Sequence, residues 1–267
     1  MMARLVTIGV LLISTTLSAA AQTVWLEPDQ FYVQPGDPVK IEVRVGADFV
    51  GQVWTPEPGK IGRMEHYAPT GRKDILESWT GDTSGRRVTL DGEGLHVIVM
   101  DLEPLLVERD GKSFTAYLEE EGLDDALWQR KRDGKMEAGA SELSSNHMKV
   151  MLQSGSSTGE GHAKRFSLPL EIVPDRNPAT LKRGDRIGFL ILLEGKPLFG
   201  AKAKVWNRYN HRIAVQNIYT QQNGRIETHV SNPGLWMVSV TGMVPAKNQP
   251  ADYRTYRTTL VFGVRQD

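Results

Sequence analysis

The sequence contains no cysteine, and this absence excludes several kinds of site at once. It leaves no disulfide, no thiolate metal ligand and no cysteine nucleophile. We also expect no lipid anchor of the bacterial lipoprotein type, because that anchor is attached to a cysteine at the cleavage site. The stability of the chain should therefore come from its hydrophobic core.

An excess of charge of either sign is missing as well. Lysine plus arginine and aspartate plus glutamate number 32 each among 267 residues. A nucleic-acid-binding surface needs a broad basic field, so we expect no nucleic-acid partner. The content of 40% hydrophobic and 24% charged residues is that of a globular protein, not of a disordered one.

Long hydrophobic runs are confined to the start of the chain. Arg4 supplies a positive charge, the run from Leu5 to Leu17 is uncharged and largely apolar, and small residues follow at 18–21. This order is typical of a secretory signal peptide, and the run is shorter than the about 20 apolar residues that span a bilayer. We predict that residues 1–21 are a signal peptide cleaved near Ala21. The mature protein should be periplasmic and have no transmembrane segment.

The remaining chain shows mainly a β pattern. Residues 39–45 read Val-Lys-Ile-Glu-Val-Arg-Val, so apolar and charged side chains alternate with the two-residue period of a strand. A turn at 35–38 precedes this segment, and a second apolar strand at 95–102 follows a glycine-rich turn. Both segments predict strands that bury at least one face.

One segment departs from the β pattern. Ser113 is suited to begin a helix, Phe114 and Leu118 lie one helical turn apart, and Gly122 is suited to end the helix. A second helical stretch runs from 123 to about 133. We predict a short two-helix insertion at the edge of a β domain.

Residues 174–178 (Pro-Asp-Arg-Asn-Pro) have the composition of a domain boundary. Beyond them short strands follow at the regular spacing that a small immunoglobulin-like sandwich needs. We therefore predict a mainly β fold with two β-sandwich (immunoglobulin-like) domains, at 22–174 and 178–267. The first domain would carry the helical insertion.

Short motifs follow one another in a distinctive order: Trp25–Pro28 (WLEP), Pro35–Val39 (PGDPV), Val45–Phe49 (VGADF), Leu170–Pro174 (LEIVP), Gly195–Ala201 (GKPLFGA), Pro233–Trp236 (PGLW) and Leu260–Phe262 (LVF). In this order they resemble a family of periplasmic proteins, classed as a domain of unknown function and associated with nickel and cobalt uptake. The resemblance spans essentially the whole mature chain. It implies a β-sandwich-rich body and a role in delivering or sensing a transition metal beside a membrane transporter. The C-terminal part is also similar to carboxypeptidase-regulatory and transthyretin-like sandwiches.

The chain departs from this family at the mature amino terminus. Relatives commonly carry a histidine just before the WLEP motif, where imidazole and terminal amine could bind a metal together. Here residues 22–24 are Gln-Thr-Val. A terminal glutamine can also cyclise, which would remove the amine as a ligand. The metal site that the resemblance implies at this position is therefore absent from this chain.

Histidine is the remaining side chain suited to nickel or cobalt, with carboxylate support. None of the six histidines has another at i+2 or i+4, so no local chelate is visible. His96 is interpreted as a strand-end residue, His211 as a turn residue and His229 as an exposed strand residue. The candidate metal ligands are the histidines near loops of the first domain: His66, His147 and His162.

The sequence predicts a protein without catalytic residues. Residues 155–159 (GSSTG) match the glycine-x-serine-x-glycine elbow of hydrolases, but that elbow needs a helix directly after it and none begins here. We expect an exported, non-enzymatic accessory to uptake or handling of a divalent transition metal, with a nickel or cobalt ion bound and a membrane metal transporter as partner. The alternative is a β-sandwich interaction module that binds a protein or glycan and no metal. An exported hydrolase is a more distant possibility.

Overall fold

The computed structural model describes residues 22–57, 59–79, 86–247 and 249–266. The predicted signal peptide and its cleavage site lie outside the described residues. Within these ranges no helix combines the length and the apolar character that crossing a membrane requires.

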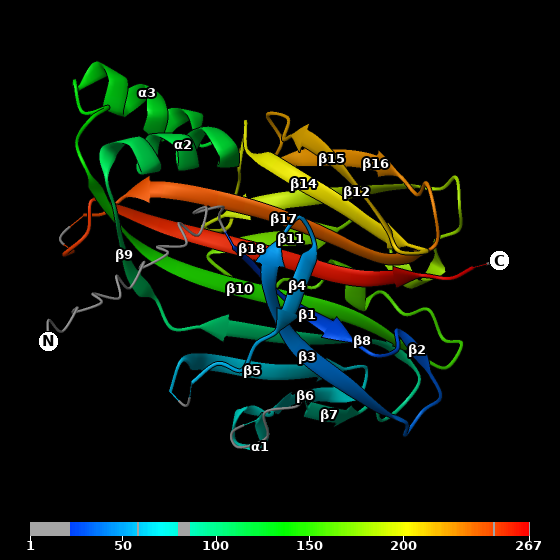
Figure 1. The fold of residues 1–267 in the computed structure, drawn as a ribbon. Coiled ribbons are helices and arrows are strands. Elements are labelled where there is room, and N and C mark those ends of the chain that lie inside the picture. Colours follow the sequence, from blue (N-terminus) through cyan, green and yellow to red (C-terminus); the bar gives the residue numbers. More distant parts are fainter. Residues whose placement is uncertain (1–21, 58, 80–85, 248, 267) are drawn as a thin grey trace, which may run out of the picture.

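A ten-stranded central sheet organises the molecule (Figure 1). Its strand order is β15-β14-β17-β18-β10-β8-β5-β6, and β2 and β9 also pair with β10. The bounds are β2 (Tyr32–Val33), β5 (Ile61–Ala68), β6 (Gly71–Asp74), β8 (Gly94–Leu102), β9 (Leu105–Arg109), β10 (Ala140–Ser154), β14 (Lys202–Tyr209), β15 (Arg212–Tyr219), β17 (Gly234–Pro245) and β18 (Tyr253–Val264).

Two four-stranded sheets accompany the central sheet. The N-terminal cover sheet contains β1 (Thr23–Pro28), β3 (Pro38–Ala47), β4 (Val50–Val53) and β7 (Arg86–Thr89). The C-terminal cover sheet contains β11 (Leu170–Pro174), β12 (Arg186–Leu193), β13 (Lys196–Pro197) and β16 (Arg225–His229). The mainly β, sandwich-rich fold predicted from the alternating pattern is thus confirmed.

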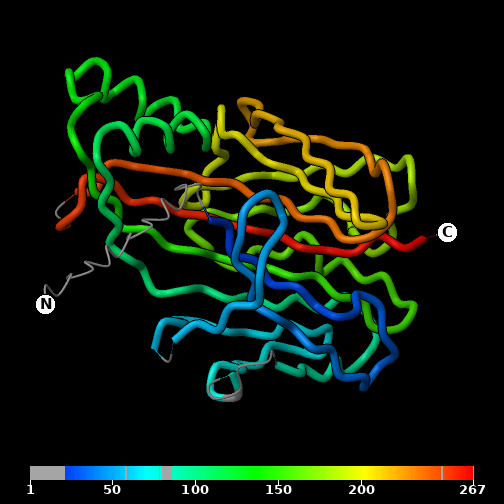
Figure 2. The backbone as a smooth tube through the Cα atoms, viewed as in Figure 1, coloured from blue at the N-terminus to red at the C-terminus, as the bar shows by residue number. Residues whose placement is uncertain are grey.

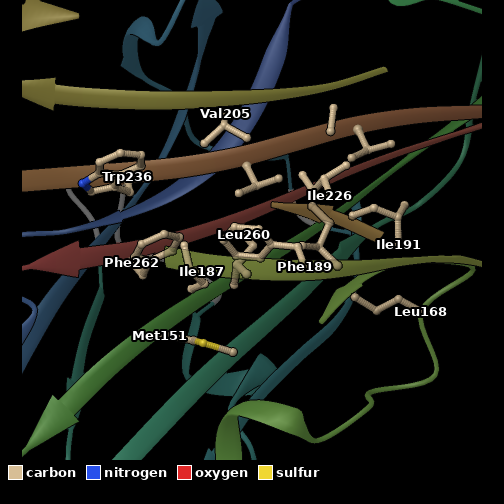
Figure 3. Close-up of a cluster of buried hydrophobic side chains, with 14 of the residues drawn as sticks. Met151, Leu168, Ile187, Phe189, Ile191, Val205, Ile226, Trp236, Leu260 and Phe262 are labelled. Carbon is tan, nitrogen blue, oxygen red and sulfur yellow. The ribbon is translucent and has the colours of Figure 1, made fainter. Parts of the chain in front are cut away.

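The two cover sheets pack on opposite faces of the central sheet. Alternate residues of a strand point to opposite faces, and in β8 Val97 and Val99 belong to one core while Ile98 and Met100 belong to the other. The first core contains residues of the C-terminal cover sheet such as Phe189 (Figure 3). The second contains residues of the N-terminal cover sheet, among them Trp25 and Val39. The strand at 95–102 is therefore buried on both faces.

The carboxyl-terminal strand lies inside the central sheet and not at its edge (Figure 2). β18 pairs in parallel with β10, from Glu142 opposite Tyr253 to Val150 opposite Val261. Its other side pairs antiparallel with β17. Strands from both sides of the boundary predicted at 174–178 therefore share one sheet, and the division into domains at 22–174 and 178–267 stays a prediction.

The helices α2 (Gly111–Glu121) and α3 (Asp124–Arg132) lie where the two-helix insertion was predicted. The other helices of the described residues are α1 (Leu76–Trp79) and the short 3₁₀ helices η1 (Gly161–Ala163) and η2 (Pro178–Thr180), which the sequence did not predict. The cap predicted at Ser113 is wrong by three residues, because the Asp110 side chain accepts a hydrogen bond from the backbone N–H of Ser113 and caps the helix. Gly122, with φ of 67°, ends α2 as predicted.

Candidate functional site

Two histidines from neighbouring strands lie against each other on the face covered by the N-terminal sheet. His66 of β5 follows the buried Met64 by two residues, and His96 of β8 precedes the buried Ile98 by two, so both point into the same core. Only 3% of His66 and 0% of His96 is exposed. Nε2 of His66 is 2.8 Å from Nδ1 of His96, and the rings are stacked with centroids 5.1 Å apart.

The hydrogen bonds around this pair determine where the protons lie. Nε2 of His96 is 3.2 Å from the carbonyl oxygen of Gly92. A carbonyl oxygen only accepts hydrogen bonds, so this nitrogen carries the proton and Nδ1 of neutral His96 has a free lone pair. Nδ1 therefore accepts the hydrogen bond that His66 donates through Nε2. A histidine whose second nitrogen donates to a backbone carbonyl is in the arrangement that orients metal ligands.

Both imidazoles are held in their neutral form. Burial first, and then the positive charges of His96 and Lys73, lower the pKa of His66 from 6.5 to about 4. Burial also lowers the pKa of His96, against the opposing effects of the Gly92 carbonyl and Asp91. Since only a neutral imidazole can bind a metal ion, neither ring would first have to lose an extra proton at neutral pH.

The carboxylate of the exposed residue Asp91 acts electrostatically on His66 and His96. The negative charge of Asp91 favours protonation of both His66 and His96, which places it within electrostatic reach of the two rings. Asp91 itself forms an exposed ion pair with Lys73, with Nζ and Oδ2 3.1 Å apart. An exposed pair of this kind contributes little stability, so the Asp91 carboxylate is free to exchange partners at low cost.

His147, the second predicted ligand, belongs to a separate buried chain of hydrogen bonds. Its Nδ1 is 2.8 Å from Oδ1 of Asp101, and its Nε2 is 3.2 Å from Oγ of Ser145. The order serine–histidine–aspartate is that of a hydrolase triad. However, Ser145 and His147 are each only 6% exposed, so the serine oxygen is not open to a substrate. The chain of bonds fixes the orientation of His147 and engages both of its ring nitrogens.

His162, the third predicted ligand, lies in η1 and is half-buried. Its Nδ1 is enclosed without a hydrogen-bond partner. The structure does not unite the three predicted ligands: in the part of the chain that it describes, no three histidine, aspartate or glutamate side chains are grouped closely enough to hold an ion. His66 is instead paired with His96, which the sequence did not indicate as a ligand.

Comparison with known proteins assigns the chain to a family. A family described as "Domain of unknown function (DUF4198)" matches residues 19–244. No curated protein matches the sequence. Among solved structures, dimeric latent PorU from Porphyromonas gingivalis is 9% identical over 95% of this chain and 21% of that chain, with a TM-score of 0.19. The chain thus spans about a fifth of PorU, and a likeness this low carries no argument.

Proposed function

Since the chain belongs to the DUF4198 family, we propose that it is an exported, non-enzymatic accessory to transition-metal uptake that binds a nickel or cobalt ion reversibly in the periplasm. The ion is its cargo, and a membrane metal transporter is the partner that receives or supplies it. The resemblance to periplasmic proteins of nickel and cobalt uptake supports the class of cargo. The pair of His66 and His96 supports the place of binding.

The single observation that carries the proposal is the spacing of the two nitrogens. Imidazole nitrogens bind a divalent transition metal at about 2.0–2.1 Å, so two ligands at a right angle are about 2.9 Å apart. Nε2 of His66 and Nδ1 of His96 are 2.8 Å apart. A turn of the two rings would aim both lone pairs at one point with little change in this spacing. The ion then replaces the hydrogen bond between the two nitrogens, and the ring proton of His66 moves from Nε2 to Nδ1, so that both rings bind as neutral imidazoles.

Two imidazoles leave further positions around the ion to be filled. Nickel and cobalt accept carboxylate oxygen alongside imidazole, and Asp91 is the carboxylate whose charge acts on both rings. It would leave Lys73 to reach the ion, and water would complete the coordination. A site with two buried imidazoles and an exchangeable carboxylate suits a protein that must also release its cargo.

Replacing His96 with glutamine is expected to weaken Ni²⁺ binding by at least about tenfold, because even the loss of a residue that only orients a ligand costs 10–100-fold. The matched control is His229→Gln, which alters an exposed histidine on β16 and should leave the affinity unchanged. Isothermal titration of residues 22–267 with Ni²⁺, Co²⁺, Cu²⁺ and Zn²⁺ measures the effect. Thermal unfolding of the metal-free variant checks that it folds.

The wild-type protein offers a second readout that does not depend on any variant. Because both imidazoles are neutral before the ion binds, we expect almost no net release of protons per ion bound at neutral pH. Titration in buffers of different ionisation enthalpy measures that number. No heat at micromolar metal, with Gln22 verified as the first residue, would contradict the proposal and favour the interaction module.

A further inference from the structure

Lys73 lies beside the histidine pair, on its exposed side. In the antiparallel pairing of β5 with β6, Lys73 is directly opposite His66, and directly opposite residues extend their side chains from the same face of the sheet. The Lys73 ammonium is paired with Asp91, the residue before Gly92, whose carbonyl is next to His96. The two charged side chains are 66% and 55% exposed, so they border the buried rings toward solvent.

The charge of Lys73 acts against a cation at the two rings. It disfavours protonation of His66, whereas the charge of Asp91 favours it. A divalent ion bound to the same ring carries twice the charge of a proton, so the ammonium repels it more strongly. Lys73 also holds the carboxylate that the proposed site offers to the ion. Both effects lower the affinity of the site.

We propose that Lys73 limits the affinity of this site and speeds release of the bound ion. The inference rests on the proposed metal site and adds the residue that controls release from it. Lys73 holds Asp91 in the metal-free protein, and the ion must displace the ammonium to gain the carboxylate. When Asp91 returns to Lys73, the ion keeps only the two imidazoles and leaves more easily. A charged ammonium has no lone pair, so Lys73 is a positioning residue and not a ligand.

The residue next to Lys73 offers a matched control. Arg72 lies on the same strand with a similar exposure, 59% against 66% for Lys73. Successive side chains of a strand point to opposite faces, and Arg72 pairs with Glu65, away from the two histidines. Replacing Arg72 therefore removes the same charge from β6 without acting on the histidine pair.

Lys73→Gln is expected to tighten Ni²⁺ binding about three- to tenfold, the size of the repulsion between an ammonium and a divalent ion several ångströms apart in a high dielectric. Release should slow, because Asp91 no longer has an ammonium to return to. Arg72→Gln, and Lys73→Arg, which keeps the charge, should both behave like the wild type. Isothermal titration of residues 22–267 gives the affinity, and stopped-flow transfer of Ni²⁺ to a chromophoric chelator gives the release rate. Thermal unfolding without metal checks that each variant folds.

A double-mutant cycle tests whether the effect passes through the carboxylate. In an Asp91→Asn background, Lys73→Gln should tighten binding less than in the wild type, since only the direct repulsion is left to remove. An undiminished gain there would contradict the exchange of Asp91 between Lys73 and the ion.

The outcomes separate this inference from the site on which it rests. A wild type that binds Ni²⁺ and is weakened by His96→Gln, but is unaffected by Lys73→Gln, would overturn the role of Lys73 and leave the proposed function standing. Equal tightening by Arg72→Gln would also overturn that role, because it would reveal a general effect of net charge. A wild type that binds no Ni²⁺ would overturn both proposals.

Discussion

Replacing Glu171 with alanine is expected to lower the free energy of unfolding by about 3–5 kcal/mol, because it leaves a buried charge without its partner. Lys149 of β10 is 0% exposed, and its Nζ lies 3.2 Å from Oε1 of Glu171. The ammonium also donates to the Ile172 carbonyl at 2.6 Å. Burial lowers the pKa of Lys149, and Glu171 is the largest influence opposing that shift.

Glu171 has a second contact that alanine would remove. Its Oε1 accepts the backbone N–H of Phe166 at 2.8 Å, and the Phe166 ring lies 5.1 Å from the Lys149 ammonium. The carboxylate therefore joins the segment before β11 to the central sheet. Its loss leaves both the ammonium and a buried N–H unpaired.

Urea unfolding measures this effect, and the chain provides a matched control. Arg186 and Glu227 form an ion pair of similar length, 3.3 Å, with side chains 67% and 58% exposed. Glu227→Ala should change stability by at most about 1 kcal/mol. The double replacement of Lys149 by methionine and Glu171 by leucine should recover much of the loss. A cost for Glu171→Ala as small as that for Glu227→Ala would contradict this account.

Acidification is expected to cost about 3 kcal/mol of stability through His66 in the absence of metal, since one pKa unit corresponds to about 1.4 kcal/mol. The pKa of this residue falls from 6.5 to about 4 on folding, chiefly through burial. Between these values the unfolded chain binds a proton that the folded chain does not. Stability therefore falls as the pH drops below 6.5, and the loss levels off near 4.

Carboxylates also titrate as the pH falls toward 4. The contribution of His66 is therefore obtained from the difference in the free energy of unfolding between the wild type and a variant without His66. His66→Gln removes the titrating group, so its stability relative to wild type should rise steadily as the pH falls from 6.5 to about 4. His229→Gln should keep a constant difference. Urea unfolding in the presence of a chelator measures both. Parallel stability curves for wild type and His66→Gln would show that the pair is not held neutral by the fold.

Local sequence pattern predicts several strands and one helix end, because strand alternation and helix ends depend on neighbouring residues. The strand at 39–45, the helix end at Gly122 and the mainly β class follow from such patterns. The parallel pairing of β10 with β18 does not, since it joins residues more than a hundred positions apart. Nothing in the spacing of either strand indicates which partner it takes.

The candidate site shows the same limit. His66 was predicted as a ligand from its residue type and place near a loop, whereas His96 was interpreted as a strand-end residue. Their pairing depends on the β5–β8 register, which places His66 opposite Ile98 and makes His96 its diagonal neighbour. A signal was available in retrospect: a histidine that leads an apolar strand points into the core and needs a polar partner there.

X-ray absorption at the nickel edge of residues 22–267 loaded with one equivalent of Ni²⁺ tests the central claim most directly. We expect two imidazole ligands on the nickel in the wild type, one in His96→Gln, and two in His229→Gln. Nickel bound only by water and carboxylate oxygen, or an unchanged number of imidazoles in His96→Gln, would contradict it.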